Sequence, residues 1–419
     1  MLRADAVIAR LVVISIVMSF AGVAGCSRDR SSPVLSSAAT VAIDSIPSPA
    51  GPGSAEPNLA VSPDGRIYMS WLEANESGHA LRFAALDGRH WSPPATIRAG
   101  RDFFVNWADF PSIEVLDGNR LAVHWLQRNG TGTYAYGVRV SQSADAGRTW
   151  STPVTPHRDG SQTEHGFVAL WREAEGLGAV WLDGRKFSKD GHDPSNEMML
   201  VTTSITPDGT LAAETRLDER TCDCCQNSAT VTADGPIVAY RNRSPDEIRD
   251  IYVTRKVAGT WTAGAPVHAD NWKIDACPVN GPAIAAAGRR VAVAWFTAAN
   301  DSARAKLAFS DDAGATFGTP VRVDDGNPAG RVDVTMIEDG SALVTWIERI
   351  GGDTAAVRSR RVHRDGKIGP AATIGSSSAA RASGFPQMAV TGSEVFFAWT
   401  VPGPTSAVRV ARASLSDFR

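Results

Sequence analysis

The sequence has little of three things that would each point to a common class of protein. Its net charge is only −3, from 42 Lys and Arg against 45 Asp and Glu, so it lacks the basic surface that nucleic-acid binding needs. Its one long apolar run, Leu11 to Ala24, is shorter than the roughly 20 residues of a membrane span. No stretch keeps apolar residues at the 3.6-residue period of a substantial helix. These absences argue against a nucleic-acid partner, a chain that crosses a membrane and a helical fold.

The short apolar run has the form of an export signal. Arg3 and Arg10 accompany it, and it ends in "VAGC", Val23 to Cys26. This ending resembles the bacterial lipobox, which implies a lipoprotein signal peptide over residues 1–25 and a lipid on Cys26. The alternative is an ordinary secretory signal in which Cys26 has no role.

The segment after the signal is polar and rich in serine, so residues 26–38 are expected to form a flexible tether. Ser27, directly after the lipidated cysteine, implies transport to the outer membrane of a two-membrane bacterium. We therefore expect a lipoprotein of the bacterial cell envelope, in the outer membrane and facing the periplasm or the cell surface. The lipid would be its only contact with the membrane.

Cysteine and tyrosine are also scarce, with five of each. If Cys26 carries the lipid, four cysteines remain, and three of them stand in "TCDCCQ", residues 221–226. The last tyrosine is Tyr252, so the final third of the chain has none.

Seven copies of one phrase fill most of the remaining chain. Each copy is a short apolar strand, a turn that is usually rich in Gly or Asp, and a second apolar strand that ends in an aromatic residue. The closing aromatics are Trp71, Trp125, Trp181, Tyr240, Trp295, Trp346 and Trp399. A period of 51 to 59 residues is typical of a propeller or solenoid.

Two more strands follow in each copy, so each copy supplies one four-stranded sheet. This predicts an all-β fold, a seven-bladed β-propeller over residues 39–419, with a six-bladed ring of the sialidase type as the alternative. The last copy stops after its third strand. The N-terminal residues 39–46, "ATVAIDSI", are expected to supply the missing strand and so to close the ring.

Two turns match the Asp-box pattern S-x-D-x-G-x-T-W/F. They are "SADAGRTW", with Ser143, Asp145, Gly147 and Trp150, and "SDDAGATF", with Ser310, Asp312, Gly314 and Phe317. The Asp carboxylate would accept backbone N–H groups, and the Gly would supply a positive φ. On these motifs the chain resembles the sialidase-like Asp-box (BNR repeat) β-propeller superfamily across residues 39–419. The resemblance implies that the Asp boxes are structural and lie away from the functional face.

Two sets of loops should meet on the opposite face, which we call the top face. One set precedes each first strand, the other follows each closing aromatic, and both are dense in charge. The expected ligand-binding residues are Arg241, Arg243, Arg331, Arg381, Trp107, His165 and Asp275. The candidates for general acid or base are Asp109, Glu164, Asp183 and Glu348. Because Arg can grip a carboxylate with two parallel hydrogen bonds, a polar or anionic ligand is expected.

The resemblance to sialidases is incomplete where catalysis is concerned. The family uses three arginines, a Tyr nucleophile late in the chain, a Glu and an Asp, whereas this chain has no late Tyr and no "RIP" motif. We therefore expect a monomeric propeller that binds a glycan or another polar ligand, or a protein partner, without standard sialidase catalysis. The alternatives are a glycoside hydrolase of the exo-sialidase type, another hydrolase or lyase, and a cysteine-based copper or zinc protein.

The four remaining cysteines should gather in one sector, because their loops precede the first strands of neighbouring blades. Cys222, Cys224 and Cys225 precede one such strand, and Cys277 precedes the next. An oxidising compartment favours disulfides, with Cys277 paired to Cys222 or Cys225. A thiolate site for Cu(I) or Zn is a second reading, although C-x-C-C is not a zinc-finger spacing. A redox-active pair is a third.

Overall fold

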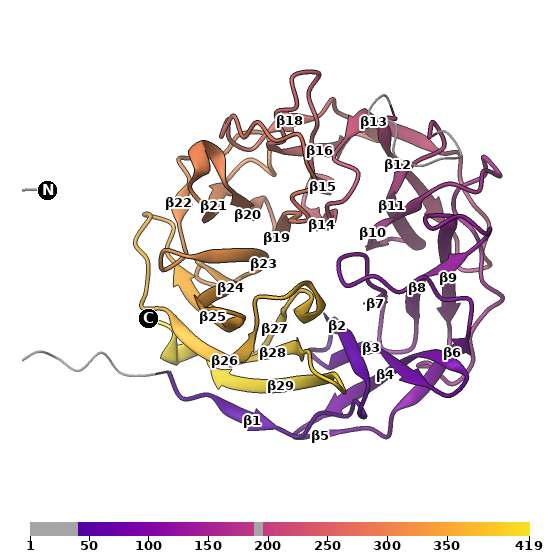
Figure 1. Ribbon diagram of the computed structural model, residues 1–419, viewed down its shortest axis with the longest axis horizontal. Helices are drawn as coiled ribbons and strands as arrows, with labels where there is room; N and C mark the ends of the chain where they lie inside the picture. Colours follow the sequence, from indigo (N-terminus) through magenta and orange to yellow (C-terminus); the bar gives the residue numbers. More distant parts are fainter. Residues whose placement is uncertain (1–40, 188–195) are drawn as a thin grey trace, which may run out of the picture. The chain divides into compact units, whose positions relative to one another are not determined.

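The computed structural model describes residues 41–187 and 196–419, and within them seven antiparallel sheets form a ring (Figure 1). Blade 1 holds β2 (Ser54–Val61), β3 (Ile67–Asn75), β4 (Gly78–Asp87), β5 (His90–Trp91) and β6 (Ala95–Gly100). Blade 2 holds β7 (Ser112–Val115), β8 (Leu121–Arg128) and β9 (Tyr136–Ser143). Blade 3 holds β10 (His165–Glu173), β11 (Gly176–Asp183), β12 (Met198–Ile205) and β13 (Thr215–Thr221). Blade 4 holds β14 (Ser228–Thr232), β15 (Gly235–Arg241), β16 (Ile251–Val257), β17 (Thr260–Trp261) and β18 (Ala265–Pro266).

The other three blades complete the ring. Blade 5 holds β19 (Ala283–Ala287), β20 (Arg290–Thr297), β21 (Arg304–Ser310) and β22 (Val321–Arg322). Blade 6 holds β23 (Pro328–Met336), β24 (Ala342–Gly351), β25 (Thr354–Val362) and β26 (Ala372–Ser378). Blade 7 holds β27 (Gln387–Thr391), β28 (Glu394–Val401), β29 (Ala407–Ser414) and β1 (Asp44–Ile46). The helical segments among the described residues are three short 3-10 turns, η1 (Ala299–Asp301), η2 (Arg381–Ser383) and η3 (Leu415–Asp417).

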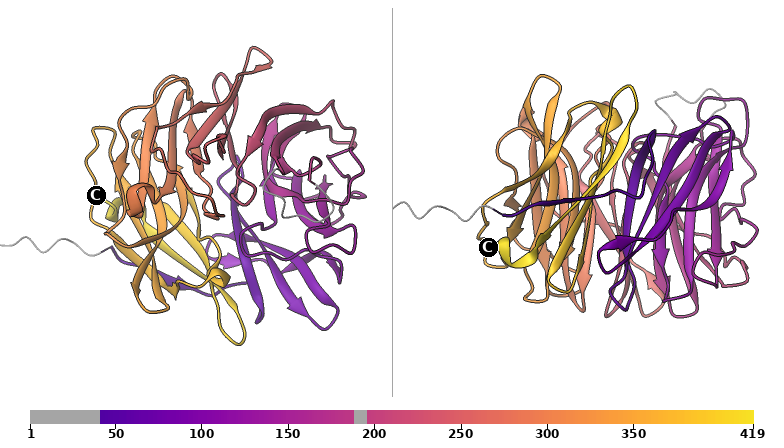
Figure 2. Two further views of the ribbon diagram at one scale, coloured as in Figure 1. Left: turned by 45° about the horizontal axis from the view of Figure 1, so that its top comes forward. Right: turned by 90° about the horizontal axis from the view of Figure 1, so that it is seen from below.

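The predicted seven-bladed β-propeller is thus confirmed, and the six-bladed alternative is wrong. In blade 2 the outermost place is taken by Val154, whose N–H and C=O both bond to Val140. The N-terminal strand closes the last blade as predicted, because β1 pairs with β29 and sets Asp44 opposite Arg412. Seen from the side, the blades run between two faces that carry the connecting loops (Figure 2). The predicted signal peptide, Cys26 and the tether lie outside the described residues and stay predictions.

The closing aromatics form the packing between blades. The five indoles of Trp71, Trp125, Trp181, Trp295 and Trp346 are at most 1% exposed. Each such ring removes roughly 150–250 Å² from water, which stabilises the fold by about 4–6 kcal/mol before chain entropy is subtracted. The hydrophobic clusters around them join neighbouring blades; one of them contains Trp181 of blade 3 together with residues of blade 2.

Both Asp boxes have the predicted structure. Asp145 Oδ1 accepts the Thr149 N–H at 2.9 Å, and Oδ2 accepts the Thr149 hydroxyl at 2.7 Å. These bonds and the Ser143 hydroxyl hold the pKa of Asp145 at about 2. Gly147 has a φ of +83°, and a Cβ there would stand 2.2 Å from the Phe83 ring of blade 1. The box therefore fixes the turn and packs one blade on the next.

The second Asp box repeats this arrangement at the other side of the ring. Asp312 accepts the Thr316 N–H at 2.9 Å and its hydroxyl at 2.7 Å. Gly314 has a φ of +81°, and a Cβ there would stand 2.3 Å from Ile237 of blade 4. Phe317 packs on the cluster that contains Ile237.

Three first strands carry a bulge at the same place, near the top of the channel. Glu56 in β2, Phe167 in β10 and Arg331 in β23 have φ of +57°, +52° and +57°. Such a φ in a residue with a side chain is strained. In each case a side chain of the preceding blade accepts the freed N–H; the three acceptors are Thr400, Asp109 and Asn280.

Candidate functional site

A turn from blade 2 covers the top of the central channel. This turn, residues 106–109, is called the cap below. Asp109 donates its N–H to Asn106 O at 3.1 Å, and Ala108 donates to Asn106 Oδ1 at 3.0 Å. In Figure 1 the segments before β7 and before β27 both reach into the middle of the ring. The cap therefore stands where ligands reach a propeller, at the mouth of the channel.

Four other blades hold the cap in place. Ala108 O accepts the Gln226 side-chain amide of blade 4, and Asp109 Oδ1 accepts the backbone N–H of Phe167, in blade 3, at 2.6 Å. The Trp107 ring stacks on Phe385 of blade 7 at 6.0 Å and faces the Arg331 guanidinium of blade 6 at 4.8 Å. The cap is thus a rigid floor for the top face.

The channel beneath the cap is a poor site for a large ligand. Its cavity is about 240 Å³ and is lined by the first strands of the ring, below the range of about 300–1,000 Å³ that small-molecule pockets have. Burial raises the pKa of Asp333 to about 7, and it raises the pKa of Glu114 to about 7 against the opposing charge of Arg172. The channel directly beneath the cap is therefore too small for an oligosaccharide, whereas the surface above the cap sets no such limit.

Two predicted acid/base candidates share one phenol beside the cap. The Tyr136 hydroxyl lies 3.0 Å from Asp109 Oδ2 and 2.8 Å from Glu164 Oε1. Burial raises the pKa of Asp109 to about 7, against hydrogen bonds from Phe167 and Tyr136. Burial and the charges of Asp109, Asp223 and Cys277 raise the pKa of Glu164 to about 8, although the Tyr136 hydroxyl acts the other way.

The bonding in this trio decides where its protons sit. A phenol has one proton and can donate to only one of two carboxylates. Asp109 already accepts the Phe167 N–H, so it is the better anion, and Tyr136 donates to it. Glu164 is partly exposed, and its raised pKa favours its protonated form at neutral pH. Because Tyr136 is 0% exposed, it cannot attack a substrate, whereas Glu164 can exchange a proton with one.

Arginines gather on the opposite side of the cap, in blades 6 and 7. Burial, and after it the charges of Arg349 and Arg381, lower the pKa of Arg331 to about 10. The Arg331 guanidinium donates to Ala380 O at 3.0 Å and to the Ser383 hydroxyl. Arg349 donates to Pro328 O, and both Arg349 and Arg381 are exposed. None of the three forms an ion pair with a carboxylate in the described part of the chain.

The four cysteines meet in one sector, as predicted, but not in the predicted pairs. All four are free thiols in the structure. Cys222 Sγ lies 3.1 Å from Cys225 Sγ and 3.7 Å from Cys224 Sγ. Cys277 instead approaches Cys224 and Asp223, and its Sγ lies 3.8 Å from Asp223 Oδ1. The predicted disulfides of Cys277 with Cys222 or Cys225 are therefore not the contacts that the fold makes.

An arginine stands against the buried end of this cluster. Arg249 Nη1 lies 3.4 Å from Cys222 Sγ and 3.5 Å from Asp223 Oδ1. Burial alone would raise the pKa of Cys222, but contacts with Cys224 and Cys225 and the charges of Arg249 and a second arginine hold it well below its usual value. These contacts favour the thiolate form of Cys222, which is the form that attacks disulfides and binds metals, whereas the raised pKa values of Cys224 and Cys225 favour their thiol forms.

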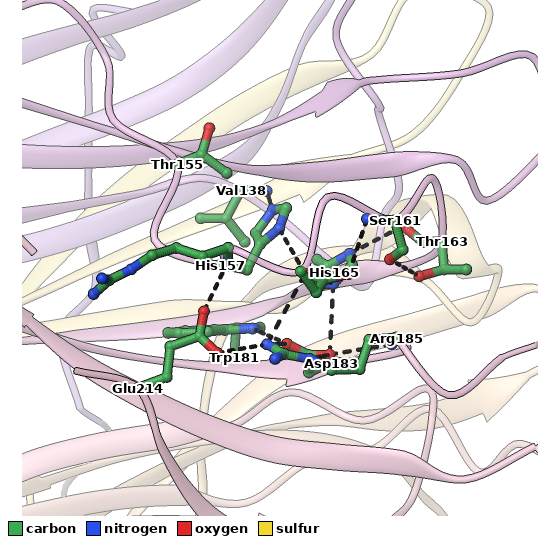
Figure 3. A network of polar contacts seen from close by, with 12 residues as sticks. Val138, Thr155, His157, Ser161, Thr163, His165, Trp181, Asp183, Arg185 and Glu214 are labelled. Carbon is green, nitrogen blue, oxygen red and sulfur yellow. Dashed lines mark hydrogen bonds and ion pairs between the residues drawn. The ribbon is translucent and has the colours of Figure 1, made fainter.

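His165 and Asp183 belong to a different, closed network (Figure 3). His165 Nε2 lies 3.1 Å from Asp159 Oδ1 and 3.5 Å from Asp183 Oδ1. Asp183 accepts two bonds from Arg185, at 2.7 and 2.6 Å, and one from the Trp181 indole at 2.8 Å. Burial opposes a charge on His165, but the two carboxylates raise its pKa to about 9.

The spacing of this network also admits a metal, because His157, Asp159 and His165 each offer one ligand atom within 4.8 Å of the others. Two features argue against it. The rings of His157 and His165 are stacked at 3.9 Å and only 10° from parallel, so their in-plane lone pairs cannot converge on one ion. His157 also accepts the Val138 N–H through Nε2. The carboxylates of Asp159 and Asp183 instead favour the protonated form of His165.

The remaining predicted residues lie apart or serve the fold. The Arg241 guanidinium is 2% exposed and donates to Asn280 O, Arg249 O and Phe296 O. Glu348 accepts the Trp346 indole at 2.6 Å, just as Asp183 accepts that of Trp181. These two acid/base candidates thus hold the indole two residues earlier. Arg243 is bound to Glu247, and Asp275 is exposed beside the thiols. Their predicted binding roles stay predictions.

Sequence reasoning missed Tyr136. It considered the loops before each first strand and after each second strand, but the third strand of a blade also begins at the top. Tyr136 is the first residue of β9. A tyrosine at that position was the available signal.

No helix among the described residues is long and apolar enough to span a membrane.

No family model matches the chain, and no curated protein matches it in sequence. Several solved structures are similar to it. A protein of unknown function from Dyadobacter fermentans has 14% identity and a TM-score of 0.46 over 90% of this chain and 98% of that one. An α-L-arabinanase from Penicillium chrysogenum, complexed with arabinobiose, has 14% identity and a TM-score of 0.48 over 91% and 99%. A variant of NanB sialidase from Streptococcus pneumoniae has 11% identity and a TM-score of 0.46 over 87% and 69%. In its fold and its Asp boxes, the chain resembles the sialidase-like β-propellers.

Proposed function

We propose that the protein binds an anionic ligand, with an acidic glycan as the leading candidate, on the top face beside the cap. One observation carries the proposal: burial and the nearby charges of Arg349 and Arg381 lower the pKa of Arg331, and none of these three arginines has a carboxylate partner in the described residues. Like charges repel, so this arrangement costs stability unless an anion completes it. Elsewhere in the chain, arginines such as Arg185, Arg249 and Arg358 are paired with carboxylates.

The proposed site is placed for a ligand that lies on the surface. Arg349 and Arg381 are exposed, and the Arg331 guanidinium is held against Trp107 of the cap. Arg331 is fixed by carbonyl and hydroxyl acceptors, which leaves it oriented in advance for a carboxylate, sulfate or phosphate group. Preorganisation of this kind lowers the entropy that binding must lose.

The test is calorimetric titration of the protein with a sialylated trisaccharide, an oligogalacturonate, a sulfated oligosaccharide and a neutral oligosaccharide of equal length. We expect binding of at least one acidic ligand, weakened by salt, and none of the neutral one. The Arg381→Ala variant should weaken that binding, whereas Arg289→Ala, an exposed arginine paired with Asp234 far from the cap, should not. Equal affinity for acidic and neutral ligands would sink the proposal.

A second candidate function, glycan cleavage by acid/base catalysis, is favoured by Glu164. Its pKa of about 8 leaves it protonated at neutral pH, as a general acid must be. The buried Tyr136 speaks against a covalent mechanism of the sialidase type. Release of a fluorogenic aglycone and formation of an unsaturated uronate would each report turnover. The Glu164→Gln variant should abolish it, and no turnover by the unmodified protein ends this candidate.

We also propose that a lipid on Cys26 anchors the chain in the bacterial envelope and that the propeller is extracytoplasmic. Support comes from the "VAGC" motif and the preceding apolar run. Incorporation of a labelled fatty acid, lost in Cys26→Ser, would test this. Labelling that survives the substitution would contradict it.

A further inference from the structure

The cysteine cluster is the strongest feature of the molecule that anion binding leaves unexplained. Cys222, Cys224 and Cys225 place their three sulfur atoms within 4.8 Å of one another. They come from the short loop between β13 and β14, and β14 is the first strand of blade 4. Cys222 and Cys225 are each 1% exposed, and Cys224 is partly exposed. Buried thiols that converge on one point have a use beyond packing.

We propose that Cys222, Cys224 and Cys225 bind one Cu(I) ion in a trigonal site at the margin of the top face, and that the thiols which are still protonated release their protons to solvent as the ion binds. Three sulfur atoms, each about 2.3 Å from one ion, lie about 3.8–4.0 Å apart. The observed separations of 3.1 and 3.7 Å come close to this, so one pair opens by less than 1 Å on binding. Soft thiolates select soft ions such as Cu(I).

The number of ligands favours Cu(I) over Zn. A structural Zn site takes four ligands in a tetrahedron, and the fourth thiol does not join this trio. Cys277 groups with Cys224 and Asp223 instead, so it stands at the exposed side of the site. Among the residues that the structure describes, no histidine joins the group of three sulfur atoms. An ion that is stable with three sulfur ligands and no others therefore fits this site best.

The surroundings of the trio hold it in place and balance its charge. Cys222 donates its N–H to Arg241 O at 2.9 Å, next to the isolated bridge between Thr221 and Asn242, so the backbone at the first thiol is held against blade 4. Arg249 Nη1 reaches Cys222 Sγ, while Arg249 Nη2 is held by Glu247 at 2.9 Å. Three thiolates with Cu(I) carry a net charge of −2, and Arg249 offsets part of it. Such outer partners tune a metal site.

The loop is also locked to the next blade. The side chain of Gln226 accepts the Gly281 N–H at 3.0 Å. A Cβ on Gly281 would stand 2.1 Å from Gln226 O, so only glycine allows this approach. The residue that follows Cys225 is thereby pinned to blade 5, and the thiols cannot swing apart.

The experiment uses the full chain with Cys26→Ser, so that its thiols are Cys222, Cys224, Cys225 and Cys277. The reduced protein is titrated anaerobically with Cu(I) against a chromogenic Cu(I) chelator, and the bound ion is examined by X-ray absorption. We expect one ion per chain, surrounded by three sulfur atoms at about 2.3 Å. Cys224→Ser should lose this stoichiometric binding, and Arg249→Gln should weaken it about tenfold.

Cys277→Ser is the matched control, because it removes a thiol of the same sector that is outside the trio. It should keep one ion per chain. Unchanged Cu(I) affinity in Cys224→Ser, or a spectrum with four sulfur neighbours that requires Cys277, would overturn the proposal. Failure of the reduced protein to compete with the chelator would do the same. Folding of each variant is checked by its thermal transition, and Cys224→Ser should still bind the anionic ligand, since the arginines lie in other blades.

Discussion

Two buried polar networks start at neighbouring residues, Glu164 and His165, and they are opposites. The His165 side chain points toward Asp159 and Asp183, and Asp183 is also paired with Arg185. In this network, therefore, carboxylates face basic groups. Glu164 points toward Asp109 and Tyr136, where two acids share one phenol and no cation of the described residues is bonded to either. The first network pulls its pKa values away from neutrality. The second brings them to about 7 and about 8. Balanced charge serves the fold, whereas unbalanced charge near neutral pKa is what chemistry uses.

The largest expected effect comes from breaking the balanced network. Asp183→Asn removes the carboxylate that Arg185, Trp181 and His165 share. Leaving buried partners uncompensated costs about 3–5 kcal/mol, so the free energy of unfolding in urea at pH 7 should fall by that amount. Glu348→Gln is the matched control: Glu348 also follows a closing Trp by two residues but has no ion-pair partner there. Equal losses in the two variants would show that charge balance is not what stabilises the first network.

A second expected effect is a loss of stability in mild alkali. The pKa of His165 is raised from 6.5 to about 9 in the folded protein. A raised pKa means that the stabilisation is complete below pH 6.5 and is lost as pH rises to about 9. For this buried histidine the loss is about 3 kcal/mol over that window. Urea unfolding at pH 6.5, 8 and 9 measures it, and His165→Gln should remove this part of the slope. A slope that His165→Gln leaves unchanged would contradict a charged His165.

In the network of Asp109, Tyr136 and Glu164, removal of a carboxylate should stabilise the protein, whereas removal of Asp183 destabilises it. The pKa of Glu164 is raised from 4.5 to about 8, so the folded protein favours its neutral form and loses stability as pH rises from 4.5 to 8. Glu164→Gln keeps the shape without the charge and should increase the free energy of unfolding at pH 8 by about 1–2 kcal/mol, less than the shift alone implies because Glu164 is partly exposed. Destabilisation at pH 8, or an equal gain at pH 4.5, would show that the carboxyl is not forced to be neutral. A stabilising substitution that removes ligand binding or turnover is typical of a functional residue.

The sequence predicted much of the arrangement that makes this comparison possible. The repeat register places Asp109, Glu164 and the four cysteines on one face, and the structure brings them to one sector of it. The sequence did not predict the direction in which each side chain points. Glu164 and His165 were both predicted as site residues, but the sequence has no signal for the bulge at Phe167 that follows them or for the side on which each packs. Arg241 likewise reads as a free cation until the three carbonyls around it are seen.

The smallest expected effect on stability tests whether the arginine side of the cap is independent of both networks. Arg381 is exposed and has no ion-pair partner in the described residues, so Arg381→Ala should change the free energy of unfolding by less than about 0.5 kcal/mol. Its removal relieves repulsion on Arg331, which makes a slight gain more reasonable than a loss. The pH windows assigned to His165 and Glu164 should stay where they are, because neither residue is coupled to Arg381. Only the affinity for the acidic ligand should fall. If Arg381→Ala also shifts the pH dependence of the free energy of unfolding, then Arg381 is electrostatically coupled to His165 or Glu164 across the cap. The arginines and the two networks would then not be independent.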